Sequence, residues 1–453
     1  MAHTASDQMV ERLIEWGVDT YFGLPGDGIN GFYEALRTHQ DRIRLIHVRH
    51  EETAAMAAVA YGKFTGRPAV CVSTAGPGAV HLLNGLCDAR IDQSPVIAIT
   101  GMTYHDVIGT HYLQDIDHDA LLRHVCSYSQ RVMGEAHVLS VTDMAARMAI
   151  THRGPVHIAI PIDIQAGEAV TGDRSIKNIE GHSGVVSQAQ KRLPPRGQLE
   201  RAAAVLSGKR RPVIFAGAGA RGAGDELERV AEILGAPIVK AMLGKDCVPD
   251  DSPYCTGGFA LVGTRPSQEA LKGCDAILIV GSSSPYIEFL PQPGQAVGVQ
   301  IDDLPERLGL RYPVEVGLAG DAKLTLQELI PLLEWNENRS FVEQAQEGMR
   351  EWRVLQADRA TREELPMKPD AVPFHLAAVL ADNAILCGDS GTVTTHAART
   401  ELRRGQLFSC AGSSSPFRGR CAAWQPGSRT PSGPRWPTPT ARWSPSPATD
   451  RSA

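Results

Sequence analysis

The feature that most constrains the fold of this 453-residue chain is an alternation between short apolar runs and longer helical stretches. Over residues 1–166 each apolar run is bounded by glycine or proline, and a stretch of helical length separates it from the next run. The runs are TYFGLPG, IRLIHVRH, PAVCVSTAGPG, SPVIAIT and GPVHIAIPIDI. Such alternation is typical of a mostly parallel sheet with helices on both faces. We therefore predict an α/β fold.

The pattern repeats along the chain, whose length favours about two to three domains with a core each. We expect an N-terminal domain over residues 1–166 and a central domain over residues 195–335. Residues 167–194 have little pattern and are expected to form a linker. Residues 371–411 offer one helix, one strand and a glycine turn, which is the start of a third domain. The prediction is an α/β protein of parallel-sheet domains with an incomplete third domain.

The composition changes to Arg, Pro, Ser and Trp over residues 412–453, without apolar periodicity. A segment of this composition cannot form a packed core, so a disordered basic tail is one interpretation. A one-base shift of reading frame offers another, because the shifted codons of residues 423–450 are compatible with MAAGLPYAIGAQVAYPDRQVVAFAGDG. We hypothesise a frameshift between Ser413 and Cys421, with the disordered tail as the alternative.

Charge and cysteine content limit the classes of partner and compartment. The net charge of −6 gives no reason to expect nucleic acid or an anionic membrane as a partner. Nine scattered cysteines without a C-x-x-C pair argue against a disulfide framework and favour a reducing compartment. The N-terminal residues lack the apolar core of a signal peptide, and no apolar run is long enough to cross a bilayer. We expect a cytoplasmic protein with no transmembrane segment.

Three loops that follow predicted strands contain candidate ligand-binding residues. They are GLPGDG (Gly23 to Gly28), RHEE (Arg49 to Glu52) and STAGPGAVHLLNG (Ser73 to Gly85). The carboxyl ends of parallel strands share one edge of a sheet, where open α/β folds bind ligands. A carboxylate in the first turn of a helix, such as Glu51, can also serve merely as a partner of the helix dipole. Position alone therefore leaves a functional role for Glu51 open.

Taken together, these loops resemble the thiamine-diphosphate enzymes of the pyruvate oxidase and acetolactate synthase superfamily. The resemblance covers residues 5–410 and rests on GLPGDGINGFYEAL, VRHEETAAMAAVAYGKFTG and STAGPGAVHLLNGLCDARIDQSPVIAITG, in that order. It implies that Glu51 is the catalytic glutamate. A carboxylic acid bonded to N1′ of the cofactor's aminopyrimidine favours the imino tautomer that takes the proton from the thiazolium C2. We expect Glu52 to be a solvated neighbour.

The resemblance also implies residues around the cofactor and substrate. Pro25, Gly76 and Asn84 match positions that line the aminopyrimidine pocket, although a purely structural role for Gly76 is an equal alternative. Gln114 matches an active-site glutamine. Leu113 stands where the family often has Phe, which leaves the substrate pocket open.

The central domain contains GAGARG (Gly217 to Gly222) directly after a predicted strand, which fits the pattern G-x-G-x-x-G. The acidic residue expected at the end of the next strand is missing from APIVKA, so we interpret GAGARG as a tight turn. The resemblance instead implies FAD in this domain, with a structural domain lacking flavin as the alternative. The residues that match FAD contacts are Gly258, Phe259, Ala260, Leu261, Gly281, Ser282, Ser283, Ser284, Pro285 and Asp302.

One further cluster, His105, His111 and His118, lies near two aspartates but lacks the spacing of helical metal ligands. We expect this stretch to be a surface loop and not a metal site.

In these enzymes the third domain holds the diphosphate through Mg²⁺, bound by the Asp of a GDG turn and a later Asn. The GDS at residues 388–390 is not that motif, so the Mg²⁺ site is expected to be missing from this chain. The resemblance implies decarboxylation of a 2-keto acid, pyruvate, with electron transfer to FAD, and a homo-oligomer, dimer or tetramer. We expect little or no activity here. The alternatives are an acetolactate synthase-type carboligase and a non-catalytic flavin-binding or subunit-interaction protein.

Overall fold

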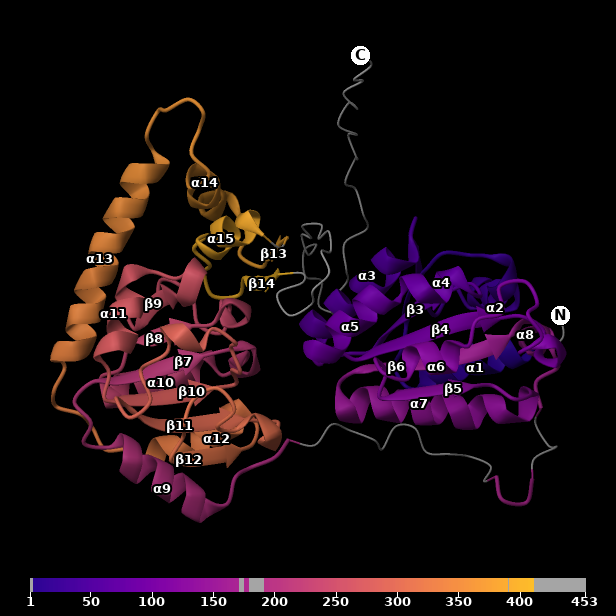
Figure 1. Cartoon of the computed structure of the whole chain (residues 1–453), viewed down its shortest axis with the longest axis horizontal. Coiled ribbons are helices and arrows are strands. Elements are labelled where there is room, and N and C mark those ends of the chain that lie inside the picture. Colours follow the sequence, from indigo (N-terminus) through magenta and orange to yellow (C-terminus); the bar gives the residue numbers. More distant parts are fainter. Residues whose placement is uncertain (1–2, 171–174, 179–190, 390, 411–453) are drawn as a thin grey trace. The chain divides into compact units, whose positions relative to one another are not determined.

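The structure is a computed structural model, and it describes residues 3–170, 175–178, 191–389 and 391–410. The tail predicted over residues 412–453 lies outside the described residues. The chain divides between Lys191 and Arg192 into two compact units, each with its own six-stranded sheet (Figure 1). The second unit contains both the predicted central domain and the predicted start of a third.

The first unit is built on a sheet in which every neighbouring pair of strands is parallel, with the order β2-β1-β3-β4-β6-β5. The strands are β1 (Thr20–Gly23), β2 (Arg44–His47), β3 (Ala69–Ser73), β4 (Val96–Met102), β5 (Tyr128–Arg131) and β6 (Pro155–Pro161). β3, β4 and β6 are buried along their whole length. They read as continuous apolar runs because helices cover both faces of the sheet.

Helices cover the first sheet on both faces. One face packs against α1 (Ala5–Glu15), α2 (Asn30–Thr38), α7 (Val138–His152) and α8 (Ile162–Ala166). The other contacts α3 (Glu51–Thr65), α4 (Pro77–His81) and α5 (Leu83–Ile91), while α6 (His118–Leu122) packs against β5 and β6. α3 and α5 approach closely, since a Cβ atom at Gly85 would lie 2.4 Å from the Cβ of Ala55. That close approach fixes the start of α5 beside the start of α3.

The strand order of the first sheet reverses direction between β1 and β3. The chain passes from β1 outward to β2, and later strands from β3 onward are added on the other side of β1. At such a reversal the loops after the two central strands diverge and leave a crevice at the carboxyl edge, the usual ligand position in open α/β sheets. The loops at this reversal are those that follow Gly23 and Ser73.

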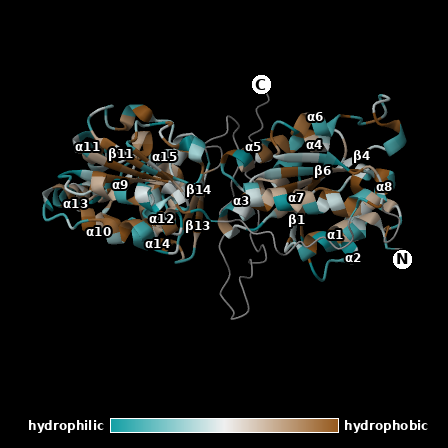
Figure 2. Cartoon of the chain, turned by 90° about the horizontal axis from the view of Figure 1, so that it is seen from below, coloured by the Kyte–Doolittle hydropathy of each residue, from teal (hydrophilic) through white to brown (hydrophobic). Residues whose placement is uncertain are grey.

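The second unit repeats this design with an all-parallel sheet of order β12-β11-β10-β7-β8-β9. Its strands are β7 (Pro212–Ala216), β8 (Ile238–Lys240), β9 (Cys255–Gly258), β10 (Ala276–Val280), β11 (Val297–Asp302) and β12 (Val316–Ala319). α9 (Arg196–Leu206), α10 (Gly224–Leu234) and α12 (Ala322–Leu329) cover one face, while α11 (Arg265–Gly273) and α13 (Ser340–Ala360) lie on the other. In Figure 2 these helices carry both apolar and polar residues, as helices between a sheet and solvent should.

The second sheet also reverses once, between β7 and β10. The loops at its reversal are therefore GAGARG after β7 and GSSSP after β10. Both loops that the sequence singled out in the central domain thus lie at the position that the topology favours for a ligand.

The last described residues of the second unit form a two-stranded parallel sheet of β13 (Ile385–Gly388) and β14 (Leu407–Cys410), with α14 (Ala371–Val379) and α15 (Thr392–Ala398). Two side chains from loops of the six-stranded sheet bind the backbone of Phe408 in β14, one at its amide and one at its carbonyl. The amide of Phe408 donates to Oδ2 of Asp246 at 3.0 Å, and Nη2 of Arg221 donates to the carbonyl of Phe408 at 2.7 Å. Arg221 and Asp246 are themselves paired at 2.8 Å. We call this arrangement the β14 clip.

Among the described residues, none of the helices combines the length and the apolar character needed to span a membrane.

Candidate active site

Glu51 is the first residue of α3, and it lies where the chain leaves β2 at the carboxyl edge of the first sheet. The helix starts here because the ring of His50 caps it, with Nδ1 accepting the amide hydrogen of Glu52 at 3.2 Å. The Glu51 side chain is only 9 % exposed. A carboxylate in the first turn also interacts favourably with the helix dipole, which partly offsets the cost of burying it.

The Glu51 carboxylate is held by His81, from the end of α4. Nδ1 of His81 lies 2.9 Å from Oε2 of Glu51, and the rings of His50 and His81 stack with centroids 4.5 Å apart. A Cβ atom at Gly78 would lie 3.2 Å from the other oxygen, Oε1, so the glycine lets the carboxylate lie against the start of α4. His81 is not among the site residues predicted from the sequence, although it stands inside the third loop motif.

The hydroxyl of a buried tyrosine lies near the Glu51 carboxylate. The hydroxyl of Tyr33, on α2, is buried and has no hydrogen-bond partner among the described residues. Burial raises its pKa, and the nearby charge of Glu51 raises it further. A Cβ atom at Gly23 would lie 2.3 Å from this hydroxyl, so the first glycine of GLPGDG makes room for it. An unpaired buried hydroxyl is what a site shaped for an absent polar ligand leaves behind.

The two loops at the reversal of the first sheet pack directly on each other. A Cβ atom at Gly26 would lie 2.6 Å from Cβ of Thr74, and the amide of Gly28 donates to Oγ1 of Thr74 at 3.2 Å. Pro25 lies on the same loop and is exposed. The loops predicted to meet at this edge are therefore brought together, and glycine is needed where their backbones touch.

Gly76 and Gln114 are also neighbours. Gly76 has φ +60°, and a Cβ atom there would lie 2.8 Å from Cβ of Gln114. Gln114 is half-buried with φ 59°, and the preceding Leu113 is 72 % exposed. The structural alternative for Gly76 therefore has a physical basis, since only glycine fits this turn without strain.

His118 also holds the turn at Gly76, through a hydrogen bond to its backbone amide. The amide of Gly76 donates to Nε2 of His118 at 3.1 Å, so Nδ1 carries the hydrogen and faces Oγ1 of Thr100 at 3.0 Å. The Thr100 hydroxyl lies 2.9 Å from Nε2 of His157, whose Nδ1 is 2.8 Å from Oγ of Ser129. We call this row the histidine chain. Its hydrogen bonds require a neutral His118.

The prediction of a surface loop for the three histidines is wrong for His118. His105 and His111 are exposed, but His118 is only 1 % exposed. Burial, together with the charge of Arg131, lowers the pKa of His118 to about 4. No periodic pattern indicates this burial, because the residue lies at the start of a short helix that follows a loop.

Glu52 is half-buried, and its carboxylate also has a partner within the chain. Nδ2 of Asn84 donates to Oε1 of Glu52 at 2.8 Å, across the close contact between α3 and α5. His50, Glu52, His81 and Asn84 line a hollow of about 330 Å³. We call it the α3–α5 hollow. A ligand that used Asn84 would have to replace or share this hydrogen bond.

The site of the first unit therefore combines a buried carboxylate, an unpaired buried hydroxyl and two glycine loops at a sheet reversal. A carboxyl group held in such a place can donate or accept a proton at a ring nitrogen of a bound heterocycle. The glycines allow the ligand to approach the backbone closely. These residues fit the aminopyrimidine of thiamine diphosphate.

In the second unit, the GAGARG turn and the GSSSP loop interlock. The amide of Gly219 donates to the carbonyl of Gly281 at 3.0 Å, and a Cβ atom at Gly217 would lie 2.4 Å from the same oxygen. Gly281 has φ +60°, and a Cβ atom there would lie 2.5 Å from backbone atoms of Gly219. These glycines are needed for contact between the two loops, which agrees with the interpretation of GAGARG as a tight turn.

The residues matched to FAD contacts lie at the carboxyl edge of the second sheet but differ in what they present. Ser282 and Asp302 are buried, Ser283 and Ser284 are half-buried, and Pro285 is exposed. Asp302 uses Oδ1 to accept the amide of Leu304 at 3.0 Å, and burial raises its pKa.

The GFAL segment from Gly258 to Leu261 ends the edge strand β9. The Phe259 ring packs in the core against Phe215, so only its backbone is available to a ligand. Ala260 has φ 59°, and Leu261 is 70 % exposed. The loops thus present backbone groups and serine hydroxyls to an extended ligand. Asp302 has a second carboxylate oxygen besides the one that accepts the Leu304 amide.

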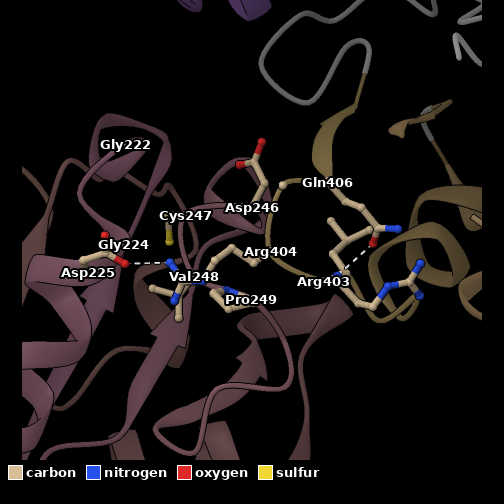
Figure 3. A pocket seen from close by; sticks show the side chains of 12 residues that line it. Gly222, Gly224, Asp225, Asp246, Cys247, Val248, Pro249, Arg403, Arg404 and Gln406 are labelled. Atoms are coloured by element: carbon tan, nitrogen blue, oxygen red, sulfur yellow. Dashed lines mark hydrogen bonds and ion pairs between the residues drawn. The ribbon is translucent and has the colours of Figure 1, made fainter. Parts of the chain in front are cut away.

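A second hollow, of about 240 Å³, lies between the start of α10 and residues 402–406 (Figure 3). Its polar groups already have partners: Nη1 of Arg404 donates to Oδ1 of Asp225 at 2.6 Å, and the backbone amide of Arg403 donates to Oε1 of Gln406 at 2.8 Å. We interpret this hollow as part of the joint that holds the two-stranded sheet, not as a ligand site.

Both units match the domains of one known enzyme family. Residues 3–121 match the N-terminal TPP-binding domain of thiamine pyrophosphate enzymes, and residues 199–329 match the central domain of the same enzymes. The chain belongs to the thiamine pyrophosphate enzyme family. Thiamine pyrophosphate is thiamine diphosphate, so the resemblance noted in the sequence is confirmed at the level of the family.

Individual relatives agree with this assignment. The chain is 37% identical over 401 residues to YdaP of Bacillus subtilis, described as a thiamine pyrophosphate-containing protein, covering 88% of this chain and 68% of YdaP. It is 31% identical to the pyruvate oxidase of Lactiplantibacillus plantarum, covering 87% of this chain and 65% of that enzyme. It is 29% identical to an acetolactate synthase large subunit assigned in Methanococcus aeolicus, with 85% and 67% covered. The chain thus spans about two thirds of the length of these relatives.

Proposed function

We propose that the first unit binds the aminopyrimidine of thiamine diphosphate and that Glu51 is the acid that tunes it. When bound, the cofactor supplies the carbon centre that adds to the carbonyl of a 2-keto acid. The observation that carries the proposal is the buried Glu51 carboxylate, which lies against α4, with Oε1 against Gly78 and Oε2 against His81.

Each proposed site residue has a distinct task. Glu51 holds or gives a proton at the ring nitrogen N1′, and His81 orients its carboxylate from the other side. Pro25 and Gly76 shape the loops on either side of the ring, and Gln114 faces the substrate from its contact with Gly76. Asn84 lies at the mouth of the α3–α5 hollow, where the ligand displaces its bond to Glu52.

We further propose that the second unit binds FAD. Backbone groups of Gly258, Phe259, Ala260, Leu261 and Gly281 would contact the flavin nucleotide, together with Ser282, Ser283, Ser284 and Pro285. Asp302 suits a ribose hydroxyl, because it ends β11 directly beside the GSSSP loop and has a second carboxylate oxygen besides Oδ1. The position of the GSSSP loop at the reversal of the second sheet supports the assignment.

The proposed reaction is decarboxylation of pyruvate with transfer of two electrons to FAD. The relatives include a pyruvate oxidase and acetolactate synthases at similar identity. An acetolactate synthase-type carboligase is therefore the second candidate, and product analysis separates the two, since the carboligase yields acetolactate.

We propose that this chain is impaired in that reaction, because its GDS at residues 388–390 does not match the GDG turn that binds the Mg²⁺ of the diphosphate. The frameshift hypothesis between Ser413 and Cys421 accounts for the missing GDG turn. Resequencing of the locus tests it: a reading frame that matches full-length relatives without an inserted or deleted base contradicts the hypothesis.

Titration of the purified chain with thiamine diphosphate and Mg²⁺, followed by pyruvate-dependent dye reduction, tests the function. We expect weak cofactor binding that Glu51→Gln weakens further, with little turnover. Turnover comparable to that of a full-length relative contradicts the proposed impairment. A yellow protein whose flavin is retained but which shows no response to thiamine diphosphate supports instead a non-catalytic flavin-binding role.

A further inference from the structure

Three metal-ligating side chains converge at the edge of the α3–α5 hollow. One ligand atom each from His50, Glu51 and His81 lie within 4.8 Å of one another. Both histidines are exposed, while the carboxylate is buried. Among the described residues, no other group of three histidine, cysteine or acidic side chains has ligand atoms this close together.

The three side chains are already held in place by other contacts. The His50 ring caps α3 through Nδ1, the His81 ring donates toward Glu51 at 2.9 Å, and the two rings stack. Ligand atoms around a tetrahedral Zn²⁺ are bound at about 2.0–2.2 Å, so small rotations of the two rings bring all three into range.

The chemistry of the ligands selects the class of metal. Two imidazoles and one carboxylate suit Zn²⁺ and its neighbours in the first transition series, whereas Mg²⁺ prefers oxygen ligands only. The Glu52 carboxylate lines the same hollow and adds negative charge beside the site. The hollow also gives a metal ion a path from solvent and room for a water as fourth ligand.

We propose that His50, Glu51 and His81 form a binding site for Zn²⁺ or a similar divalent transition metal. This site differs in its ligands from the Mg²⁺ that holds a diphosphate, because it uses two imidazoles. It is formed entirely by residues of the first unit.

The site has a consequence that rests on the proposed function of Glu51. A metal bound to the carboxylate removes the proton-holding group from the aminopyrimidine. Zn²⁺ and thiamine diphosphate therefore exclude each other in the first unit, and Zn²⁺ acts as a competitive inhibitor of cofactor binding, while Mg²⁺ does not.

Titration of the full chain with Co²⁺, followed by visible absorption, tests the metal site directly. Co²⁺ replaces Zn²⁺ in such sites, and a tetrahedral complex gives intense bands that added Zn²⁺ removes. We expect one Co²⁺ per chain at this site. His81→Gln and His50→Asn should each weaken binding at least about tenfold, since each removes a direct ligand. Asn at position 50 keeps a helix cap, so the variant isolates the loss of the imidazole.

His105→Gln is the matched control, because His105 is an exposed histidine paired with one carboxylate, Asp163. We expect Co²⁺ binding unchanged in this variant. Equal binding by His81→Gln, His50→Asn and the unmodified chain would overturn the metal site. Zn²⁺ binding that leaves thiamine diphosphate affinity unaltered contradicts only the assignment of Glu51, so failure of the metal site and failure of the proposed function are distinguishable.

Discussion

The ammonium group of Lys240 lies 2.7 Å from Oδ1 of Asp250 in the interior of the second unit. Lys240 is 1% exposed, and a second ammonium group, from Lys245, lies 2.8 Å from Oδ2. That same oxygen accepts the amide of Leu402 at 2.8 Å, so the ion pair also anchors the chain on its way to β14. Burial alone would raise the pKa of Asp250. The two ammonium groups outweigh that effect and hold the pKa well below its usual range.

Replacement of Asp250 by Asn should destabilise the second unit strongly. The variant leaves the buried ammonium of Lys240 without its counter-charge, which costs about 3–5 kcal/mol in comparable buried pairs. Urea unfolding followed by circular dichroism measures the loss. Arg404→Ala is the control, because Arg404 pairs with Asp225 and Glu228 at the surface and should contribute less than about 1 kcal/mol. Similar losses of unfolding free energy in both variants would contradict the expectation that the buried ion pair contributes more than the exposed one.

The β14 clip predicts local protection of one backbone amide. The Phe408 amide is bonded to Asp246, whose side chain is fully buried. In Asp246→Asn the acceptor loses its charge and the pairing with Arg221, so we expect hydrogen exchange at Phe408 to accelerate roughly tenfold or more, as for a lost charge-assisted hydrogen bond. Exchange resolved by mass spectrometry of peptides that contain residues 402–410 measures this. Arg350→Ala, which removes an exposed pair, should leave the same peptides unchanged.

The histidine chain makes the first unit sensitive to acid. The pKa of His118 is about 4 in the folded chain and about 6.5 in the unfolded chain, so the unfolded chain binds more protons between these values. The contribution of His118 to the free energy of unfolding is therefore fully present above pH 6.5. It falls as the pH drops toward 4, by on the order of 3 kcal/mol in total. Urea midpoints at pH 7 and pH 4.5 measure the slope. His118→Gln cannot titrate and should flatten it; an unchanged slope assigns the acid sensitivity elsewhere.

The contact between α3 and α5 predicts a specific steric effect. In Gly85→Val the new side chain meets the backbone of Ala55, where even a Cβ atom would lie 2.7 Å from the carbonyl carbon. We expect destabilisation by about 1–3 kcal/mol, since neither helix can move without disturbing the core. Gly197→Ala, on α9, meets no atom within 4 Å and should be neutral or stabilising. Thermal unfolding of both variants measures the difference.

The sequence predicted the parallel sheets and the meeting of the three loops, because apolar runs and their order determine topology to a large extent. It did not predict the partners within the site. Glu51 pairs with His81 because α4 folds back over the start of α3, and Glu52 pairs with Asn84 because Gly85 lets two helices approach. Such contacts depend on tertiary geometry that no local pattern encodes. The burial of His118 is a further case, since its environment comes from β4 and from the loop that contains Gly76.

Each of the two large sheets reverses its strand order within its own unit, and each reversal has its own pair of loops. A mutation in one pair of loops therefore does not alter the crevice in the other sheet. Changes in the loops of one unit can accumulate over evolution without a change of fold in either sheet.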